Sequence, residues 1–240
     1  MICFLTSSPV IPDTETLNPA NGFVRELKGR LPEETEALFI CSDPASTEKT
    51  DHFSASLKTT FEAAGFRFSA WRVLDGRNPE QAGTLIRSAG LLILAGGHVP
   101  TQNRFFHSVG LKELLKAWDG VIIGISAGSM NSATTVYAQP ELPGETADPA
   151  FRRFIPGLGL TETMLLPHMN FLRYDTLDGL RIFEDIAFPD SEGRTVWAVP
   201  DGSYLFIADG KEELRGEAWR IRDGAMTRIA KEGEITTDLE

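Results

Sequence analysis

Cysteine and histidine are scarce in this sequence, which has two cysteines and four histidines among its 240 residues. Cys3 and Cys41 both fall in apolar stretches that we expect to be buried strands, where a free cysteine behaves as a small apolar residue. We therefore expect a cytoplasmic protein without disulfides. The histidines are scattered, and neither a C-x-x-C nor an H-E-x-x-H spacing occurs, so the sequence predicts no metal site and no cofactor.

Long apolar runs and an excess of positive charge are also missing. No apolar run approaches the roughly 20 residues of a membrane span. Residues 1–5 are apolar but have no basic region before them, so we expect a first strand there rather than a signal peptide. The net charge of -11 argues against nucleic acids and anionic membranes as partners. We expect a monomer or homodimer that acts on a small molecule.

Strands and helices alternate through the first half of the chain. Apolar runs predict strands at residues 2–7, 36–42, 66–74, 91–95 and 121–125. Helical spacing predicts helices at residues 21–29, 54–64, 78–88 and 102–118, which lie between those strands. This order is typical of a mostly parallel sheet covered on both faces, so we predict a three-layer α/β/α sandwich. With 42% hydrophobic residues, residues 1–240 can form one domain around a single core.

The second half of the chain is less regular. We expect strands at residues 134–138, 164–168 and 195–200, a helix at 175–187, and a hairpin that leads into a strand at 203–208. The connection 139–156 is rich in proline, glycine and acids and is long for a compact domain, which favours a loop that covers a substrate. Residues 217–235 alternate around Asp223-Gly224, and this pattern predicts a hairpin within a C-terminal segment, 209–240, that is appended to the domain.

One strand end carries the pattern G-x-S-x-G, in Gly124-Ile125-Ser126-Ala127-Gly128. In a nucleophile elbow, glycines on either side allow the strand and the following helix to pass close to a strained serine, whose hydroxyl then points out of the sheet. The Ala127 N–H would face a developing oxyanion. An ordinary Gly/Ser turn after a buried strand would give the same letters, so the motif needs partners.

The partners that a serine nucleophile needs are a base and an acid that orients the base. His168 is the one histidine after Ser126, and Asp201 follows the next predicted strand, so all three would lie at the same edge of the sheet. Either residue could instead belong to an ordinary turn. Three further acids compete with Asp201 for the orienting role, and these are Glu141, Glu145 and Asp148.

Together these residues resemble peptidase family S51, the serine peptidases that include aspartyl dipeptidase (peptidase E) and cyanophycinase and that are similar to class I glutamine amidotransferases. Four segments carry the resemblance, which spans residues 2–208: Leu94-Ala95-Gly96-Gly97, Gly124-Ile125-Ser126-Ala127-Gly128, Leu166-Pro167-His168 and Val199-Pro200-Asp201-Gly202. The resemblance implies that Ser126 is the nucleophile and His168 the general base, with the N–H groups of Gly97 and Ala127 as oxyanion hole. It also suggests a substrate site that includes Gly96, His98, Asn131 and Arg173.

Two departures from the family pattern concern the acid and the specificity. Aspartyl dipeptidase has Pro-Glu-Gly where this chain has Pro-Asp201-Gly, and Glu141 corresponds to an aspartate of the family and is the alternative acid. The family's dipeptidases bind an acidic side chain with an arginine after the histidine, but Leu177 stands near that position here. A strict preference for N-terminal aspartate is therefore not expected.

The sequence thus predicts a serine hydrolase that cleaves a small peptide or amide through an acyl-enzyme on Ser126. Two alternatives remain at this point. One is an amidotransferase-like or esterase-like hydrolase that uses the same elbow on another acyl donor. The other is a catalytically degenerate homologue that binds a ligand or partner in the crevice.

Overall fold

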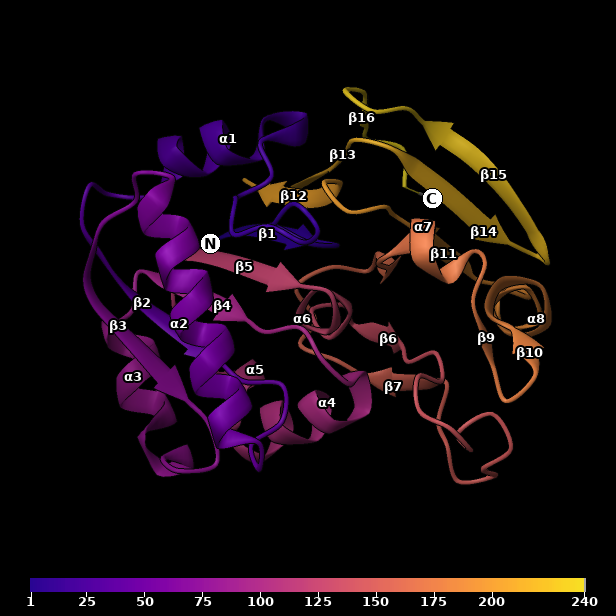
Figure 1. The fold of residues 1–240 in the computed structure, drawn as a ribbon, viewed down its shortest axis with the longest axis horizontal. Coiled ribbons are helices and arrows are strands. Elements are labelled where there is room, and N and C mark those ends of the chain that lie inside the picture. Colours follow the sequence, from indigo (N-terminus) through magenta and orange to yellow (C-terminus); the bar gives the residue numbers. More distant parts are fainter. Residues whose placement is uncertain (240) are drawn as a thin grey trace.

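An eight-stranded sheet forms the centre of the protein in a computed structural model that describes residues 1–239 (Figure 1). Its strand order is β16-β13-β12-β1-β5-β4-β2-β3, and β1 to β5 run parallel. The mostly parallel central sheet that the sequence predicts is confirmed. The strands are β1 (Ile2–Thr6), β2 (Thr35–Ile40), β3 (Phe68–Leu74), β4 (Leu91–Leu94), β5 (Val121–Ile125), β12 (Tyr204–Ala208), β13 (Lys211–Arg215) and β16 (Ile235–Thr236).

Helices cover both faces of the parallel half of this sheet. All four residues of β4 are buried, and alternate residues face opposite layers: Leu91 and Ile93 pack in the core with α1 and α2, whereas Leu92 and Leu94 pack with α3, α4 and α5. This arrangement is the predicted three-layer sandwich. The helices and short 3-10 turns are η1 (Ala20–Gly22), α1 (Phe23–Arg30), α2 (Thr47–Ala63), η2 (Pro79–Gln81), α3 (Ala82–Ser88), α4 (Val99–Ser108) and α5 (Leu111–Leu115).

A second, four-stranded sheet packs against the antiparallel half of the first. Its order is β15-β14-β11-β8, and Trp197 and Ala218 join the same core cluster as Leu205 and Leu214 of the central sheet. The hairpin predicted at Asp223-Gly224 joins β14 to β15 and is confirmed by the pairing of these strands. The strands are β8 (Met164–Leu166), β11 (Thr195–Ala198), β14 (Ala218–Arg222) and β15 (Ala225–Ala230).

The C-terminal segment is built into both sheets. β13 and β16 extend the central sheet, while β14 and β15 belong to the second one. The prediction of a hairpin between β11 and β12 is wrong, because these two strands do not pair with each other. β11 pairs with β8 and β14, whereas β12 pairs with β1 and β13. The turn at Asp201-Gly202 therefore carries the chain from one sheet to the other.

Two predicted helices differ from the structure because of glycine turns. The segment 102–118 breaks into α4 and α5 at Gly110, which has a φ of 66°. The segment 175–187 begins as a two-stranded ribbon, since Asp178 and Gly179 both adopt positive φ and turn the chain back on itself. The remaining elements are α6 (Ala127–Met130), β6 (Thr135–Tyr137), β7 (Phe154–Pro156), α7 (Met169–Leu172), β9 (Thr176–Leu177), β10 (Leu180–Arg181), η3 (Ile182–Ala187, a π-helix) and α8 (Phe188–Asp190).

The connection between β6 and β7 contains no helix or strand from residue 138 to 153.

Both cysteines are buried and unpaired. Burial raises the pKa of each thiol to about 12. Among residues 1–239, no helix is both long enough and apolar enough to cross a membrane.

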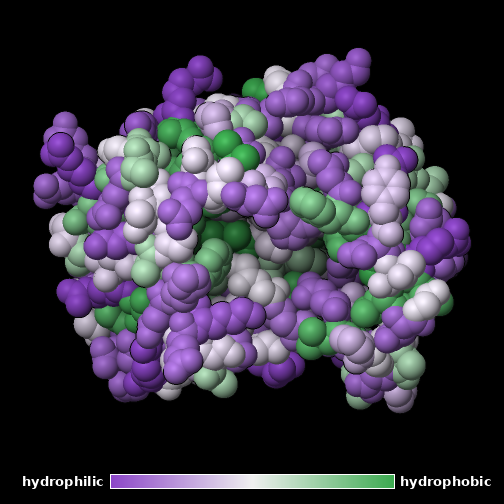
Figure 2. All heavy atoms as spheres, in the orientation of Figure 1, coloured by the Kyte–Doolittle hydropathy of each residue, from purple (hydrophilic) through white to green (hydrophobic). Residues whose placement is uncertain are grey.

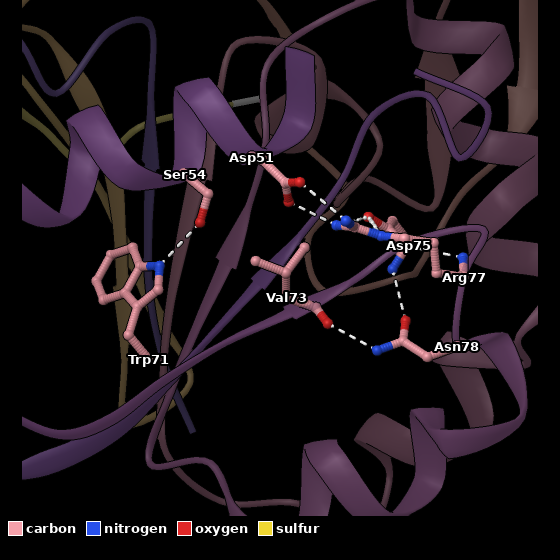
Figure 3. A network of polar contacts seen from close by, with 7 residues as sticks. All are labelled: Asp51, Ser54, Trp71, Val73, Asp75, Arg77 and Asn78. Atoms are coloured by element: carbon pink, nitrogen blue, oxygen red, sulfur yellow. Dashed lines mark hydrogen bonds and ion pairs between the residues drawn. The ribbon is translucent and has the colours of Figure 1, made fainter. Parts of the chain in front are cut away.

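A polar network fixes the outer edge of the central sheet to α2 (Figure 3). Arg77 contacts Asp51 on α2 and also donates to the buried Asp75, with an Nη2–Oδ2 distance of 2.6 Å. Trp71 on β3 donates to Ser54 on α2 at 2.8 Å. Since Asp75 is 1% exposed, its carboxylate depends on this arginine for a counter-charge.

We expect Arg77→Met to lower the free energy of unfolding by about 2 kcal/mol, because it leaves Asp75 buried without its cation. The matched control is Arg72→Met. Arg72 pairs with Glu36 at 2.7 Å, but the Glu36 side chain is 20% exposed and can be solvated when the arginine is lost, so this variant should lose less than about 1 kcal/mol. Urea unfolding of both variants measures the difference, and equal losses would contradict the role of Asp75.

Candidate active site

Ser126 lies in the turn between β5 and α6, with a φ of 49° and a ψ of -109°. This is a conformation that side-chain-bearing residues rarely adopt, so neighbouring contacts must hold it. The Ser126 N–H donates to the carbonyl oxygens of Thr6 at 3.0 Å and Ser7 at 3.1 Å. The end of β1 thus holds the strained turn in place.

The two glycines of the G-x-S-x-G pattern are required by close backbone packing. A Cβ on Gly128 would lie 2.2 Å from the Leu94 carbonyl oxygen, and one on Gly124 would lie 2.9 Å from the Ser129 nitrogen. Helix α6 therefore passes directly over the end of β4, which only glycine permits. This is the local geometry that the sequence motif predicts.

His168 and Asp201 reach Ser126 from the other sheet. His168 follows β8 and Asp201 follows β11, and these two strands are parallel neighbours. The His168 Nε2 lies 2.9 Å from the Ser126 Oγ, and the Nδ1 lies 2.8 Å from the Asp201 Oδ1. The structure therefore brings together the three residues that the sequence analysis singled out.

Ser7 is a fourth residue in the hydrogen-bond chain formed by Ser126, His168 and Asp201, and the sequence analysis did not identify it. Its hydroxyl donates to the Asp201 Oδ1 at 2.5 Å and accepts the backbone N–H of His168 at 2.8 Å. Ser7 is fully buried and follows β1 directly. A polar residue just after the central parallel strand, at the same edge as Ser126, was the available signal.

The pKa of Asp201 reflects two opposing effects. Burial alone would raise the pKa, but the hydrogen bonds from His168 and Ser7 outweigh burial and hold the pKa below its ordinary value. Asp201 is therefore ionised at neutral pH and can only accept hydrogen bonds.

Two backbone N–H groups lie beside the serine. Neither the Gly97 nor the Ala127 N–H donates to a backbone oxygen of residues 1–239. Gly97 has a φ of 151°, and a Cβ there would lie 2.3 Å from the Ser42 Oγ, so this position requires glycine. Gly96 packs against the turn, since a Cβ there would lie 3.5 Å from the Ser126 Cβ.

A cavity of about 360 Å³ opens at Ser126 and His168. Figure 2 shows the molecule hollowed near the centre of this face, with hydrophobic residues at the bottom of the hollow. The residues that line the cavity are Gly97, Ser126, Met130, Gln139, Glu141, Leu166, Pro167, His168 and Leu172. Residues 1–239 contain no cluster of three or more His, Cys, Asp or Glu side chains suited to a metal ion.

The three alternative acids lie apart from the Nδ1 of His168, where Asp201 is bound. Glu141 lines the cavity near the start of α4. Glu145 contacts the His98 Nε2 at 2.8 Å, and Asp148 accepts the Ala150 N–H at 2.8 Å.

Glu141 has an unusual pKa. Burial is the main cause and the nearby Glu145 carboxylate adds to it, while a hydrogen bond from the Val99 N–H acts in the opposite direction. The result is a pKa raised to about 8.

None of the four residues expected in the substrate site lines this cavity, although Gly96 packs against the turn at Ser126. Asn131 is fully buried, and its side-chain amide bonds with Val99, Gln102 and Asn103. Both ring nitrogens of His98 are engaged, by Thr101 and Glu145.

The positively charged candidate also lies outside the cavity. Arg173 is exposed and its guanidinium stacks over Trp219, 5.4 Å from the ring centre. Leu177 packs in the apolar cluster around η3 and is likewise not a lining residue.

Comparisons with known proteins agree on the type of protein. Residues 3–215 match peptidase family S51. A peptidase from an acI-B1 Actinobacterium has a similar structure, with a TM-score of 0.68 and 16% identity over 98% of this chain and 96% of the other. A putative peptidase E from Listeria monocytogenes EGD-e gives a TM-score of 0.57 and 17% identity over 95% and 98% of the two chains. No curated protein matches the sequence.

The raised pKa of Glu141 predicts a pH-dependent cost to stability. From pH 4.5, the ordinary pKa, to about pH 8, the unfolded chain ionises this residue while the folded chain resists ionisation, so stability is lost as the pH rises through this window. Glu141→Gln removes the cost. Between the two ends of the window, we expect the free energy of unfolding of the variant to rise by about 1 to 2 kcal/mol relative to that of wild type. This value is smaller than the pKa shift alone would give, because Glu141 is partly exposed to solvent.

Urea unfolding at both ends of the window measures this effect, with the exposed Glu184→Gln as control. The same pH slope for wild type and Glu141→Gln would contradict the raised pKa.

Proposed function

Because the chain belongs to peptidase family S51, we propose that it is a serine peptidase that hydrolyses dipeptides or related small amides through an acyl-enzyme on Ser126. The observation that carries this proposal is the continuous hydrogen-bond chain Ser126–His168–Asp201, with distances of 2.9 and 2.8 Å, at the mouth of a cavity. The scarcity of cysteine supports a cytoplasmic location.

The protons in this chain have one consistent arrangement. Ionised Asp201 accepts a hydrogen bond from the Nδ1–H of His168. The His168 Nε2 then carries no proton and can accept a hydrogen bond from the Ser126 hydroxyl. The Ser7 hydroxyl donates a hydrogen bond to Asp201 and accepts one from the backbone N–H of His168. Both contacts are consistent with the same arrangement of protons. His168 is therefore oriented as a base before substrate binds.

In the acylation step, the Ser126 Oγ attacks the amide carbon while its proton passes to the His168 Nε2. A carbon–oxygen bond forms and the carbonyl electron pair moves to oxygen. The N–H groups of Gly97 and Ala127 are suited to stabilise this oxyanion. Collapse of the intermediate breaks the carbon–nitrogen bond, and His168 returns the proton to the leaving amine.

In the deacylation step, water replaces the amine and attacks the ester carbon while His168 takes its proton. A second oxyanion forms in the same place. When it collapses, the proton returns to the Ser126 Oγ and the carboxylic acid is released.

Ser126→Ala should abolish hydrolysis of a dipeptide library, because no nucleophile remains. Mass spectrometry of the products measures this hydrolysis. The control is Ser8→Ala, outside the cavity, which should keep full activity. Circular dichroism should show the same fold for both variants. Unchanged turnover by Ser126→Ala would reject this mechanism.

The acid can be identified by comparing rates. Asp201→Asn should lower kcat/KM by about 10³-fold or more, since the amide no longer enforces the His168 tautomer. Glu141→Gln should cost far less. The reverse order of losses would assign the orienting acid to Glu141.

Ser7→Ala should lower kcat by about 10-fold with little change in KM, because it removes one bond that positions Asp201 and His168 without touching the substrate. Steady-state kinetics on the best dipeptide measure this split. An effect confined to KM would mean that Ser7 does not act through the chain.

A further inference from the structure

The cavity beside Ser126 carries one carboxylate, Glu141, and no lysine or arginine among its lining residues. Its walls include the apolar side chains of Met130, Leu166 and Leu172. A carboxylate in such surroundings loses hydration without gaining a cation. The cavity is therefore complementary to a positively charged ligand group with an apolar neighbour.

Gln139 is a second polar residue that lines the same cavity. The side chain is 5% exposed, and its buried Oε1 has no hydrogen-bond partner among residues 1–239. A buried acceptor without a donor is destabilising, so most such atoms are satisfied by a ligand or by water. An incoming N–H group would remove this cost.

The backbone next to Glu141 is held firmly. The Glu145 Oε2 accepts the N–H groups of Glu141 at 2.8 Å and of Leu142 at 3.0 Å. The Glu145 Oε1 contacts the His98 Nε2 at 2.8 Å, which ties this loop to the start of α4. The Glu141 carboxylate is thus presented at a fixed place.

The charges around Glu141 support the same ligand. Burial and the Glu145 carboxylate disfavour ionisation and raise the pKa of Glu141 to about 8. A bound ammonium would supply the missing counter-charge. An acidic side chain would instead find no cation among the lining residues, and the guanidinium of Arg173 stacks on Trp219 outside the cavity.

We propose that Glu141 and Gln139 bind the protonated α-amino group of the substrate's N-terminal residue, and that the cavity selects an apolar rather than an acidic side chain on that residue. This inference rests on the proposed function, since it names the substrate class of that site. The ammonium would donate to the Glu141 carboxylate and to the Gln139 Oε1. Its charge-assisted bonds should favour a free amine by at least about 10-fold.

The kinetic test uses small aryl amides at neutral pH. We expect wild type to hydrolyse leucine p-nitroanilide with a kcat/KM at least about 10-fold above its des-amino analogue, isocaproyl p-nitroanilide, and above aspartate p-nitroanilide. In Glu141→Gln the leucine-to-isocaproyl ratio should fall toward one, whereas the exposed control Glu184→Gln should keep it. Equal rates of wild type on the leucine and isocaproyl amides, an unchanged leucine-to-isocaproyl ratio in Glu141→Gln, or faster hydrolysis of the aspartate amide by wild type would overturn the proposal.

A further substrate separates the two sources of an ammonium group. N-acetyl-lysine p-nitroanilide carries its charge on the side chain alone. The proposal predicts poor turnover of this compound. Turnover as fast as that of leucine p-nitroanilide, and lost in Glu141→Gln, would assign the site to a basic side chain and overturn the α-amino assignment.

A binding measurement keeps this inference separate from the mechanism. Ser126→Ala protein is titrated with leucinamide and with isocaproamide, followed by NMR. We expect leucinamide to bind at least about 10-fold more tightly, and this difference to disappear when Glu141→Gln is added. Equal affinities would overturn the inference even if Ser126 proves to be the nucleophile. The expected difference without any turnover by wild type would reject the proposed function alone.

Discussion

The hydrogen-bond chain from Ser7 through Asp201 and His168 to Ser126 joins the central sheet to the second sheet. Ser7 and Ser126 end parallel strands of the central sheet, whereas His168 and Asp201 end strands of the second sheet. These hydrogen bonds therefore form only when the two sheets are packed together correctly. Their shared apolar core, rather than any local motif, fixes the distance between His168 and Ser126.

Much of this arrangement could be predicted from the sequence, because the parallel strands are short apolar runs, and the central strands β4 and β5 are fully buried and flanked by glycine. The elbow at Ser126, the histidine and Asp201 all follow such runs. The second sheet could not be predicted, since pairing between β11 and β8 or β14 depends on contacts far apart in the sequence. Ser7 was missed for the same reason: its partners, His168 and Asp201, are more than 150 residues away. The ribbon at Asp178-Gly179 was misread because apolar residues on both sides also fit helical spacing.

The cavity shows how function and stability oppose each other in this fold. Glu141 and Gln139 are both buried polar groups that the folded chain leaves without full compensation. Their cost is consistent with a site that is completed by a ligand. Membership in peptidase family S51 defines the type of chemistry, but the lining of this cavity, and not the fold, sets which substrate fits.

The most direct test of the central claim is covalent labelling of the native protein with a small organophosphorus fluoridate, analysed by intact-protein and peptide mass spectrometry. Such a reagent phosphorylates a serine hydroxyl only when a neighbouring base activates it. We expect one adduct per chain, located on Ser126, and its loss when His168 is replaced by alanine. An adduct on a different residue, or labelling of Ser126 that does not depend on His168, would contradict it.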